Sequence, residues 1–191
     1  MVYYEKEIKR DYKFEGRILN LRVDTVEMPD GSQATREVVE HNGGVAVVAV
    51  DEKDRVYLVR QYRRPLDRDL LEIPAGKLDK GEDHRLGAIR ELKEETGLTA
   101  GNLLYLSGTA ASPGYTSEII HLYLATDLTR GEAQLDEGEF LNLEIYTLDE
   151  AVEMIKKGEI VDGKTINALL LAKEILQGGG EKCTDRSKAI F

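Results

Sequence analysis

The segment from Gly76 to Leu98, GKLDKGEDHRLGAIRELKEETGL, constrains this chain more than any other stretch of its sequence. It places Glu91, Glu94 and Glu95 at the i, i+3 and i+4 positions of a predicted helix, so that three carboxylates share one face. Like charges that lie so close repel and take up protons unless a cation neutralises them. Mg²⁺ bound by a few carboxylates together with substrate phosphates is the usual solution. The segment therefore predicts metal-dependent phosphate chemistry.

The same predicted helix carries an apolar stripe made of Leu86, Ile89 and Leu92. At about 100° per residue this stripe lies opposite the glutamates, so we expect the helix to bury it and to present the carboxylates on the other face. Arg90 lies one turn before Glu94, where it can hold that carboxylate by a charge-assisted hydrogen bond. The alternative is a solvated, glutamate-rich helix face, which is what most runs of charge are.

The spacing of the fixed residues in this segment resembles the Nudix box. Gly76, Glu82 and the run from Arg90 to Leu98 match every fixed position of that motif. Nudix hydrolases cleave nucleoside diphosphates that are linked to another moiety. The resemblance implies an α/β fold, the Nudix α/β/α sandwich with a mixed sheet.

The resemblance also implies which residues bind the metal ion. Glu91, Glu95 and the main-chain carbonyl of Ala75 match the family's ligands, and Glu94 is a further ligand when more than one ion binds. Glu94 and Arg90 are also expected among the catalytic residues. The implied cofactor is Mg²⁺, for which Mn²⁺ can substitute.

Three features outside the box resemble the ADP-ribose pyrophosphatase branch of the family. The first is Pro113 with Gly114, placed after Gly97 as in that branch, where proline stiffens the loop and glycine lets the backbone approach a ligand. An ordinary turn is the alternative. The second is the pair of runs around Arg63 and Glu72. Arg63 would contact a substrate phosphate bidentately, and Glu72 would bind substrate or pair with an arginine.

A third feature is the acidic loop at 136–140, with the sequence DEGEF. It resembles the loop that carries the branch's catalytic glutamate, which places the general base at Glu139 and leaves Glu137 as the alternative. A solvated acidic loop without a catalytic role is the other interpretation of the same residues.

The N-terminal segment, 1–42, resembles the extra antiparallel β-sheet of that branch, which forms an intertwined homodimer and contributes substrate contacts. Arg36 matches the arginine that helps to sandwich the adenine, so it is the expected substrate-binding residue of this segment. The aromatic partner would be Tyr4, Tyr12 or Phe14, although core packing is the favoured role for each of them.

Hydrophobic periodicity and turn residues predict the remaining organisation. A Nudix domain is expected over 43–178, followed by a tail at 179–191. The unbroken apolar run at 45–50 is typical of a strand buried on both faces, and Thr147 with Glu150 has capping-box spacing. Further strands are predicted at 17–28, 33–41, 55–62, 70–74, 103–109, 119–126 and 141–147, with helices at 148–157 and 164–177.

Composition limits the partners and the location that we expect. The net charge of −10 argues against nucleic acid as a partner. No apolar run approaches membrane-spanning length, so no membrane partner is expected. Cys183 is the single cysteine and cannot form an internal disulfide, which favours a reducing, cytoplasmic location.

Two further patterns receive no functional role. The sequence from Gly158 to Thr165 satisfies the P-loop pattern literally. The segment before it is predicted to be a helix rather than a buried strand, so we expect no phosphate cradle there. Surface or packing roles are expected for the three histidines, which lack a second ligand at zinc-site spacing: His41, His84 and His121.

These features together predict a Mg²⁺-dependent hydrolase of ADP-ribose, or of ADP-sugars more widely, that yields AMP and ribose 5-phosphate. The substrate could instead be GDP-mannose, NADH or a dinucleoside polyphosphate, because the box sets the chemistry and not the leaving group. A non-catalytic nucleotide sensor is the alternative from another class of protein. The intact glutamates argue against that alternative.

Overall fold

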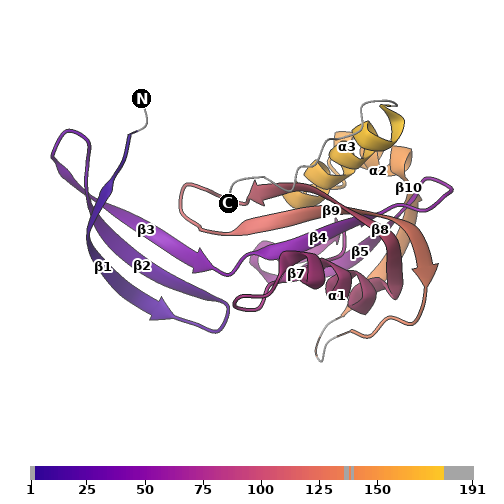
Figure 1. Ribbon diagram of the computed structural model, residues 1–191, viewed down its shortest axis with the longest axis horizontal. Helices are drawn as coiled ribbons and strands as arrows, with labels where there is room; N and C mark the ends of the chain where they lie inside the picture. Colours follow the sequence, from indigo (N-terminus) through magenta and orange to yellow (C-terminus); the bar gives the residue numbers. More distant parts are fainter. Residues whose placement is uncertain (1–2, 136–137, 139, 179–191) are drawn as a thin grey trace. The chain divides into compact units, whose positions relative to one another are not determined.

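The computed structural model describes residues 3–135, 138 and 140–178 of the chain. It forms two compact units (Figure 1). Unit 1 is the chain up to Gly43 together with Ala110–Ile119, and unit 2 is Gly44–Thr109 together with the chain from Ile120 onward. Among these described residues, no helix is long and apolar enough to cross a membrane.

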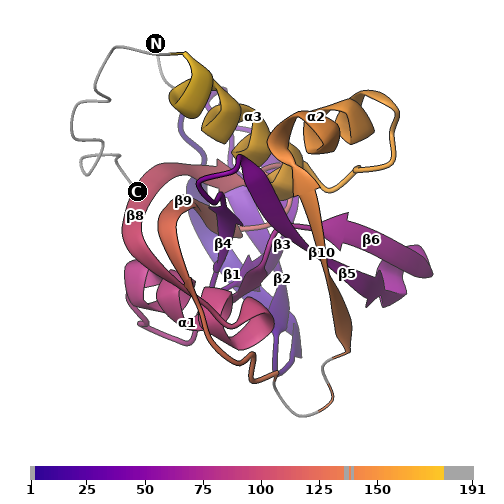
Figure 2. The same cartoon turned by 90° about the vertical axis from the view of Figure 1, so that its right-hand side faces the viewer.

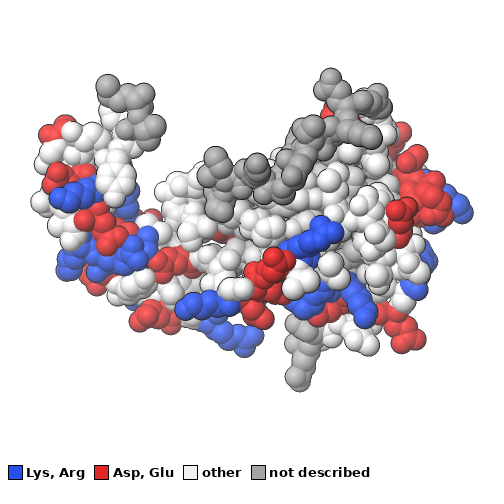
Figure 3. Space-filling view, viewed as in Figure 1, with Lys and Arg blue, Asp and Glu red and all other residues white. Residues whose placement is uncertain are grey.

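Unit 1 is built on an antiparallel sheet of β1 (Lys6–Glu15), β2 (Leu19–Glu27) and β3 (Gln33–His41), in that order. The predicted N-terminal antiparallel sheet is therefore confirmed. The turn between β2 and β3 passes through Gly31, whose φ of 83° favours glycine. Charged side chains of both signs are interspersed over this sheet (Figure 3).

The segment Ala110–Ile119 belongs to unit 1 because it pairs with β3. The Val39 N–H donates to the Tyr115 carbonyl at 2.7 Å, and the Ser117 N–H donates to the Val39 carbonyl at 3.0 Å. The segment therefore continues the backbone hydrogen bonding of β3 although it is distant in sequence.

Unit 2 contains a mixed sheet, a second sheet and helices on both sides (Figure 2). Its elements are β4 (Gly44–Ala49), β5 (Arg55–Arg63), η1 (Arg64–Leu66), β6 (Arg68–Glu72), β7 (Ala75–Lys77), α1 (His84–Thr96), β8 (Leu98–Ala110), β9 (Ile119–Arg130), β10 (Leu141–Thr147), α2 (Leu148–Lys156) and α3 (Gly163–Gln177). The mixed sheet has the order β7-β4-β9-β8, with β4 parallel to β9 and antiparallel to β7. The second sheet is antiparallel, with the order β10-β5-β6. With α1 on one face of the mixed sheet and α2 and α3 on the other, the predicted α/β/α sandwich is confirmed (Figure 1).

The central strand β4 is apolar throughout because both of its faces are covered. On one face Val48 packs in a cluster with Leu148 of α2 and Leu169 of α3. On the other face Val47 packs in a cluster with Leu92 of α1. Full burial of such a side chain stabilises the fold by about 1.5–3 kcal/mol, so an alternating sequence here would weaken one layer of the sandwich.

Capping residues fix the ends of the helices that flank the sheets. The Asp83 side chain accepts hydrogen bonds from two backbone N–H groups in the first turn of α1. The helix ends at Gly97, which has a left-handed φ of 71°. Thr147 and Glu150 form the predicted capping box at the start of α2.

The prediction that α1 buries its apolar stripe is wrong. Leu92 is buried, but Leu86 is 63% exposed and Ile89 is 43% exposed. The buried face of the helix includes Glu91 and Glu95 instead. These carboxylates can be buried because they have polar partners: the Ala75 N–H of β7 donates to Glu95, and Arg90 of α1 itself donates to Glu91.

Several predicted strand boundaries also differ from the structure, and β9 extends to Arg130 beyond the strand expected at 119–126. The strand expected at 70–74 is β6, which begins at Arg68 and ends at Glu72, and β7 begins after Pro74, which has no backbone N–H to donate to a ladder. The carbonyl of Pro74 instead accepts a hydrogen bond from the Val47 N–H at 2.9 Å. The strand expected at 103–109 begins earlier, at Leu98.

Candidate active site

The acidic face of α1 lies against the first residues of β7. Glu95 Oε2 accepts a hydrogen bond from the Ala75 N–H at 3.0 Å. Glu91 occupies the space beside Gly76, where an added Cβ would meet the carboxylate carbon at 1.9 Å. Both carboxylates are buried. In this orientation the Glu91 carboxylate leaves no room for a Cβ at position 76.

Arg90 binds three carboxylates of the loop and helix. Its Nη1 donates to Glu91 Oε1 at 2.7 Å and to Glu94 Oε2 at 2.9 Å, so the expected contact with Glu94 is present. Its Nε donates to Glu82 Oε1 at 3.1 Å. The hydrogen bond from Arg90 lowers the pKa of Glu82, and the same bond contributes most to a raised pKa for Arg90.

The donor set here is one that a hard divalent cation prefers, because it consists of oxygen atoms. Carboxylates of Glu91, Glu94 and Glu95 lie on α1, and the carbonyl of Ala75 lies on β7. In the part of the chain that the structure describes, no three acidic, histidine or cysteine side chains are placed closely enough to hold an ion. The glutamates are directed to Arg90 and to backbone instead. The residues fit an oxygen-bound cation, which would offset the mutual repulsion of carboxylates that now share one guanidinium.

A second acidic centre lies at Glu72, the last residue of β6. Its carboxylate is 1% exposed and accepts hydrogen bonds from Arg63 Nε and Nη2, each at 2.7 Å, and from Lys164 Nζ. Burial raises the pKa of Glu72, but the hydrogen bonds and charges of Arg63 and Lys164 outweigh it, so the net pKa is lowered. Pairing with an arginine was one of the two roles expected for Glu72, and its ion pair with Arg63 confirms that role. Contact with substrate stays a prediction for both residues.

The other predicted substrate-binding residues lie in unit 1. Arg36 on β3 forms a bidentate ion pair with Glu5, with distances of 2.9 and 2.6 Å. Pro113 and Gly114 are exposed and lie in a turn that a backbone hydrogen bond of 3.1 Å closes. A Cβ added to Gly114 would meet nothing within 4 Å, so local packing does not require glycine there.

The expectation that the three aromatic candidates for adenine stacking pack in a core is wrong. The side chains are 76%, 41% and 57% exposed for Tyr4, Tyr12 and Phe14, respectively. Within unit 1 the described residues supply no second layer to cover the three-stranded sheet. The predicted general base, Glu139, and its alternative, Glu137, both lie outside the described residues.

Sequence reasoning missed two residues of the rejected P-loop pattern. Lys164 Nζ donates to Glu72 and, at 3.0 Å, to Asp162 Oδ2. Thr165 Oγ1 accepts the Ile73 N–H at 3.0 Å. The helix α2 precedes this segment, so the pattern does not have the strand that a P-loop needs. The N-cap signal of Asp162 could have placed Lys164 and Thr165 in the first turn of α3, but not against β6.

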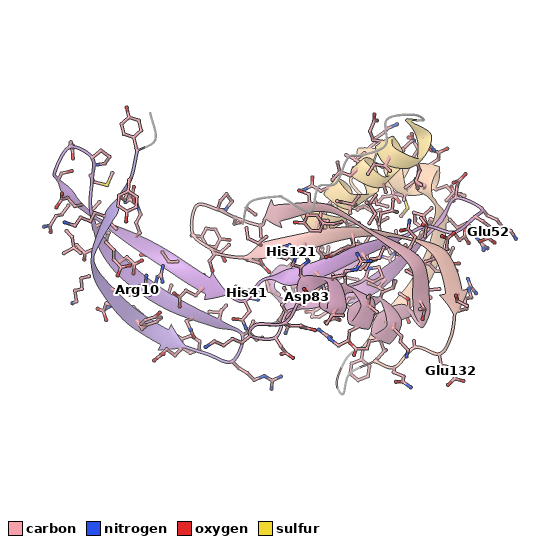
Figure 4. The ribbon with its side chains drawn as sticks, viewed as in Figure 1. Arg10, His41, Glu52, Asp83, His121 and Glu132 are labelled. Carbon is pink, nitrogen blue, oxygen red and sulfur yellow. The ribbon has the colours of Figure 1, made fainter. Side chains whose placement is uncertain are left out.

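Two of the histidines pack against each other near the start of α1. The rings of His84 and His121 are stacked, with centroids 4.1 Å apart and an interplanar angle of 9°. The Tyr123 hydroxyl is hydrogen-bonded to His84 Nδ1, and the Tyr105 hydroxyl lies 3.3 Å from His121 Nδ1. Burial, followed by the charge of His84, lowers the pKa of His121 (labelled in Figure 4).

An α/β/α sandwich in which a glycine-bearing loop meets an acidic helix defines a Nudix-type hydrolase. Residues 40–169 match the family model of the NUDIX domain. Residues 5–39 match the nucleoside diphosphate sugar hydrolase N-terminal domain. The chain therefore belongs to the NUDIX family.

Individual relatives extend this similarity over most of the chain. A protein named methanol dehydrogenase activator, from Bacillus methanolicus, is 48% identical over 88% of this chain and 92% of its own length. A protein named ADP-ribose pyrophosphatase, from Bacillus subtilis (strain 168), is 42% identical over 91% of this chain and 96% of its own. A crystal structure of an ADP compounds hydrolase superposes with a TM-score of 0.82 at 25% identity, covering 94% of this chain and 98% of that chain. The resemblance to the ADP-ribose pyrophosphatase branch is confirmed.

Proposed function

We propose that this protein hydrolyses the diphosphate of ADP-ribose to AMP and ribose 5-phosphate in a Mg²⁺-dependent reaction. The observation that carries the proposal is the contact of Glu91 and Glu95 with Gly76 and Ala75, which gathers oxygen donors at the glycine loop. The Bacillus subtilis relative supports ADP-ribose as the substrate. The match to a nucleoside diphosphate sugar hydrolase domain supports the wider class of ADP-sugars.

The metal ion would be held by Glu91, Glu95 and the carbonyl of Ala75, with Glu94 as a further ligand and Mn²⁺ as a substitute. When bound, a divalent ion neutralises diphosphate charge and acidifies water. Arg90 orients the carboxylates of Glu91 and Glu94 toward one side of α1 through its Nη1 hydrogen bonds.

Arg63 is proposed to bind a phosphate of the substrate. Its Nε and one N–H of Nη2 bind Glu72, so the N–H groups of Nη1 and the second N–H of Nη2 are the donors that it can offer, from a side chain that is 37% exposed. Charge-assisted hydrogen bonds from this edge would stabilise charge on the phosphoryl oxygens. Glu139 is proposed as the general base that takes the proton of the attacking water, with Glu137 as the alternative.

Unit 1 is proposed to bind the adenosine part of the substrate through Arg36, Pro113 and Gly114. Arg36 would have to leave Glu5 to stack on the base, and exposed ion pairs of this kind contribute little to stability. As part of the same proposal, the 1–42 segment also forms a homodimer. Residues 43–178 are the catalytic domain and residues 179–191 are a tail. The enzyme is proposed to be cytoplasmic.

A panel of nucleotide conjugates tests the substrate. ADP-ribose, GDP-mannose, NADH and a dinucleoside polyphosphate would be incubated with the protein and Mg²⁺, and the products separated by chromatography. We expect ADP-ribose to have the highest kcat/KM and to give AMP and ribose 5-phosphate in equal amounts. A preference for another conjugate would change the substrate, and binding without hydrolysis of any of them would favour a nucleotide sensor.

A pair of substitutions tests the base. Glu139→Gln is expected to lower kcat by about 10²–10⁴-fold, the usual contribution of general-base catalysis, with a much smaller change in KM. Glu137→Gln is the matched control in the same acidic loop. If Glu137→Gln gives the large loss and Glu139→Gln does not, the base is Glu137.

A further inference from the structure

The linker 72–75, which joins β6 to β7 and carries the Ala75 carbonyl, is held at every residue. Its partners come from four elements, β5, α3, β4 and α1, all within unit 2. The contacts are those of Glu72 with Arg63 and Lys164, of the Ile73 N–H with Thr165 Oγ1, of the Pro74 carbonyl with the Val47 N–H, and of the Ala75 N–H with Glu95 Oε2. A site built in this way positions its groups before substrate arrives.

Helix α3 supplies two adjacent side chains to this linker. Lys164 contacts Glu72 and Thr165 contacts Ile73, so consecutive residues of the helix hold consecutive residues of the linker. Thr165 is fully buried, and the Lys164 side chain is 10% exposed. Asp162, the N-cap of α3, binds both Lys164 and Thr165 and fixes them relative to the helix.

The charge of Lys164 is not explained by packing. Burial of an ammonium group costs several kcal/mol, and an apolar side chain of similar length would pack against the linker without that cost. Lys164 faces Glu72 and Asp162, whereas Arg63 faces Glu72 from the other side. With Lys164 present, the two carboxylates are balanced by two cations, and Arg63 is not the sole partner of the buried carboxylate.

We propose that Lys164 is a positioning residue for the hydrolysis reaction. It holds the Glu72 carboxylate in the orientation that fixes the guanidinium of Arg63, and this leaves Arg63 Nη1 directed to the substrate phosphate. This inference rests on the proposed function, because Arg63 must contact a phosphate for its orientation to matter.

The test compares Lys164→Met with Lys173→Met. Lys173 lies on the same helix and also forms an ion pair, with Asp149 at 2.7 Å, but it does not contact the linker. We expect Lys164→Met to lower kcat/KM for ADP-ribose by about 10–100-fold, the usual loss when a group that supports an active-site residue is removed. ADP-ribose affinity, measured by calorimetry in EDTA, should fall with it. Lys173→Met should leave kcat/KM and ADP-ribose affinity unchanged.

A double-mutant cycle with Arg63→Met separates positioning from a general structural role. If Lys164 acts through Arg63, the double variant is no worse in kcat/KM than Arg63→Met alone. If Lys164→Met does not fold, Lys164→Gln, which keeps an N–H donor, carries the same expectation. Equal activity of the Lys164 and Lys173 variants, or additive losses in the cycle, would overturn the inference and leave the proposed function standing. A wild-type protein that hydrolyses no conjugate of the panel would overturn the proposed function and the inference with it.

Discussion

Unit 2 contains two acidic centres, and they differ in how the charge of their carboxylates is balanced. The Glu72 centre consists of Glu72, Asp162, Arg63 and Lys164, so that cations and carboxylates are matched. The α1 centre consists of Glu82, Glu91, Glu94, Glu95 and Arg90, in which one guanidinium is shared by three of the carboxylates. The same residue type therefore serves two purposes. A neutralised carboxylate holds structure, whereas clustered carboxylates around a shared cation are suited to recruit a metal ion.

The largest effect should follow from removing a charge of the α1 centre. Glu95→Gln keeps the size of the side chain but removes a proposed metal ligand, so kcat/KM should fall by at least about 100-fold, the upper range for a supporting residue. Thermal unfolding and Mn²⁺ titration by calorimetry would show a retained fold and weakened metal binding. Near-wild-type activity of this variant would contradict the metal assignment.

Gly76→Ala should damage the α1 centre without unfolding the protein. The added Cβ would meet the flexible end of Glu91, which must turn away, so we expect kcat/KM to fall by about 10–100-fold with little change in Tm. Gly163→Ala is the matched control, because a Cβ there meets nothing within 4 Å. Unchanged activity of Gly76→Ala would show that the position of Glu91 in this structure is not needed for the reaction.

The Glu72 centre should respond in stability as well as in activity. Glu72→Gln leaves Arg63 and Lys164 without their buried anion, at a cost of about 1.5–3 kcal/mol in the free energy of unfolding. Because the folded pKa of Glu72 lies below its ordinary value of 4.5, its contribution is present above that pH and is lost as pH falls through the lowered pKa.

Urea denaturation at a series of pH values measures this contribution. The wild type should lose more stability than Glu72→Gln between pH 7 and acid, since the variant has no carboxyl group to titrate at this position. Parallel pH curves for the two proteins would show that Glu72 is not stabilised as an anion.

The smallest effect is expected on the outer face of α1. Leu86→Gln should change the free energy of unfolding by less than about 0.5 kcal/mol, because Leu86 is mostly exposed and belongs to neither centre. Chemical denaturation of the wild type and the variant is the appropriate measurement. A loss comparable to that of a buried leucine would mean that this face is covered in solution.

The helices and strands of the fold could be predicted from the sequence, but the orientation of α1 on the sheet could not. The apolar run of β4 and the capping box of α2 are local signals, and the structure agrees with both. The rotation of α1 could not be found from its apolar stripe, because β7 supplies the N–H that binds Glu95 and the glycine that leaves room for Glu91. A hydrophobic pattern distinguishes the polar face of a helix from its apolar face, but it does not show which polar groups have hydrogen-bond partners in the interior.

The candidate site shows the same limit at longer range. The spacing of Arg90 and Glu94 is a contact within one helix, so it could be predicted and is present. Lys164 and Glu72 are 92 residues apart, and no local pattern connects them. The sequence analysis rejected the P-loop pattern that contains Lys164 and gave this residue no role, because its partner Glu72 depends on tertiary packing.

The contacts between α3 and the linker also bear on how the enzyme becomes active during folding. Closing a loop between residues 92 apart is slow compared with forming α1 or a local hairpin. During synthesis the segment that carries β7 and α1 leaves the ribosome well before Lys164 and Thr165 do, so the linker at Ala75 is without this support on the nascent chain. Hydrolysis should therefore be among the last properties that the folding chain acquires, which would keep an incomplete protein from cleaving nucleotides.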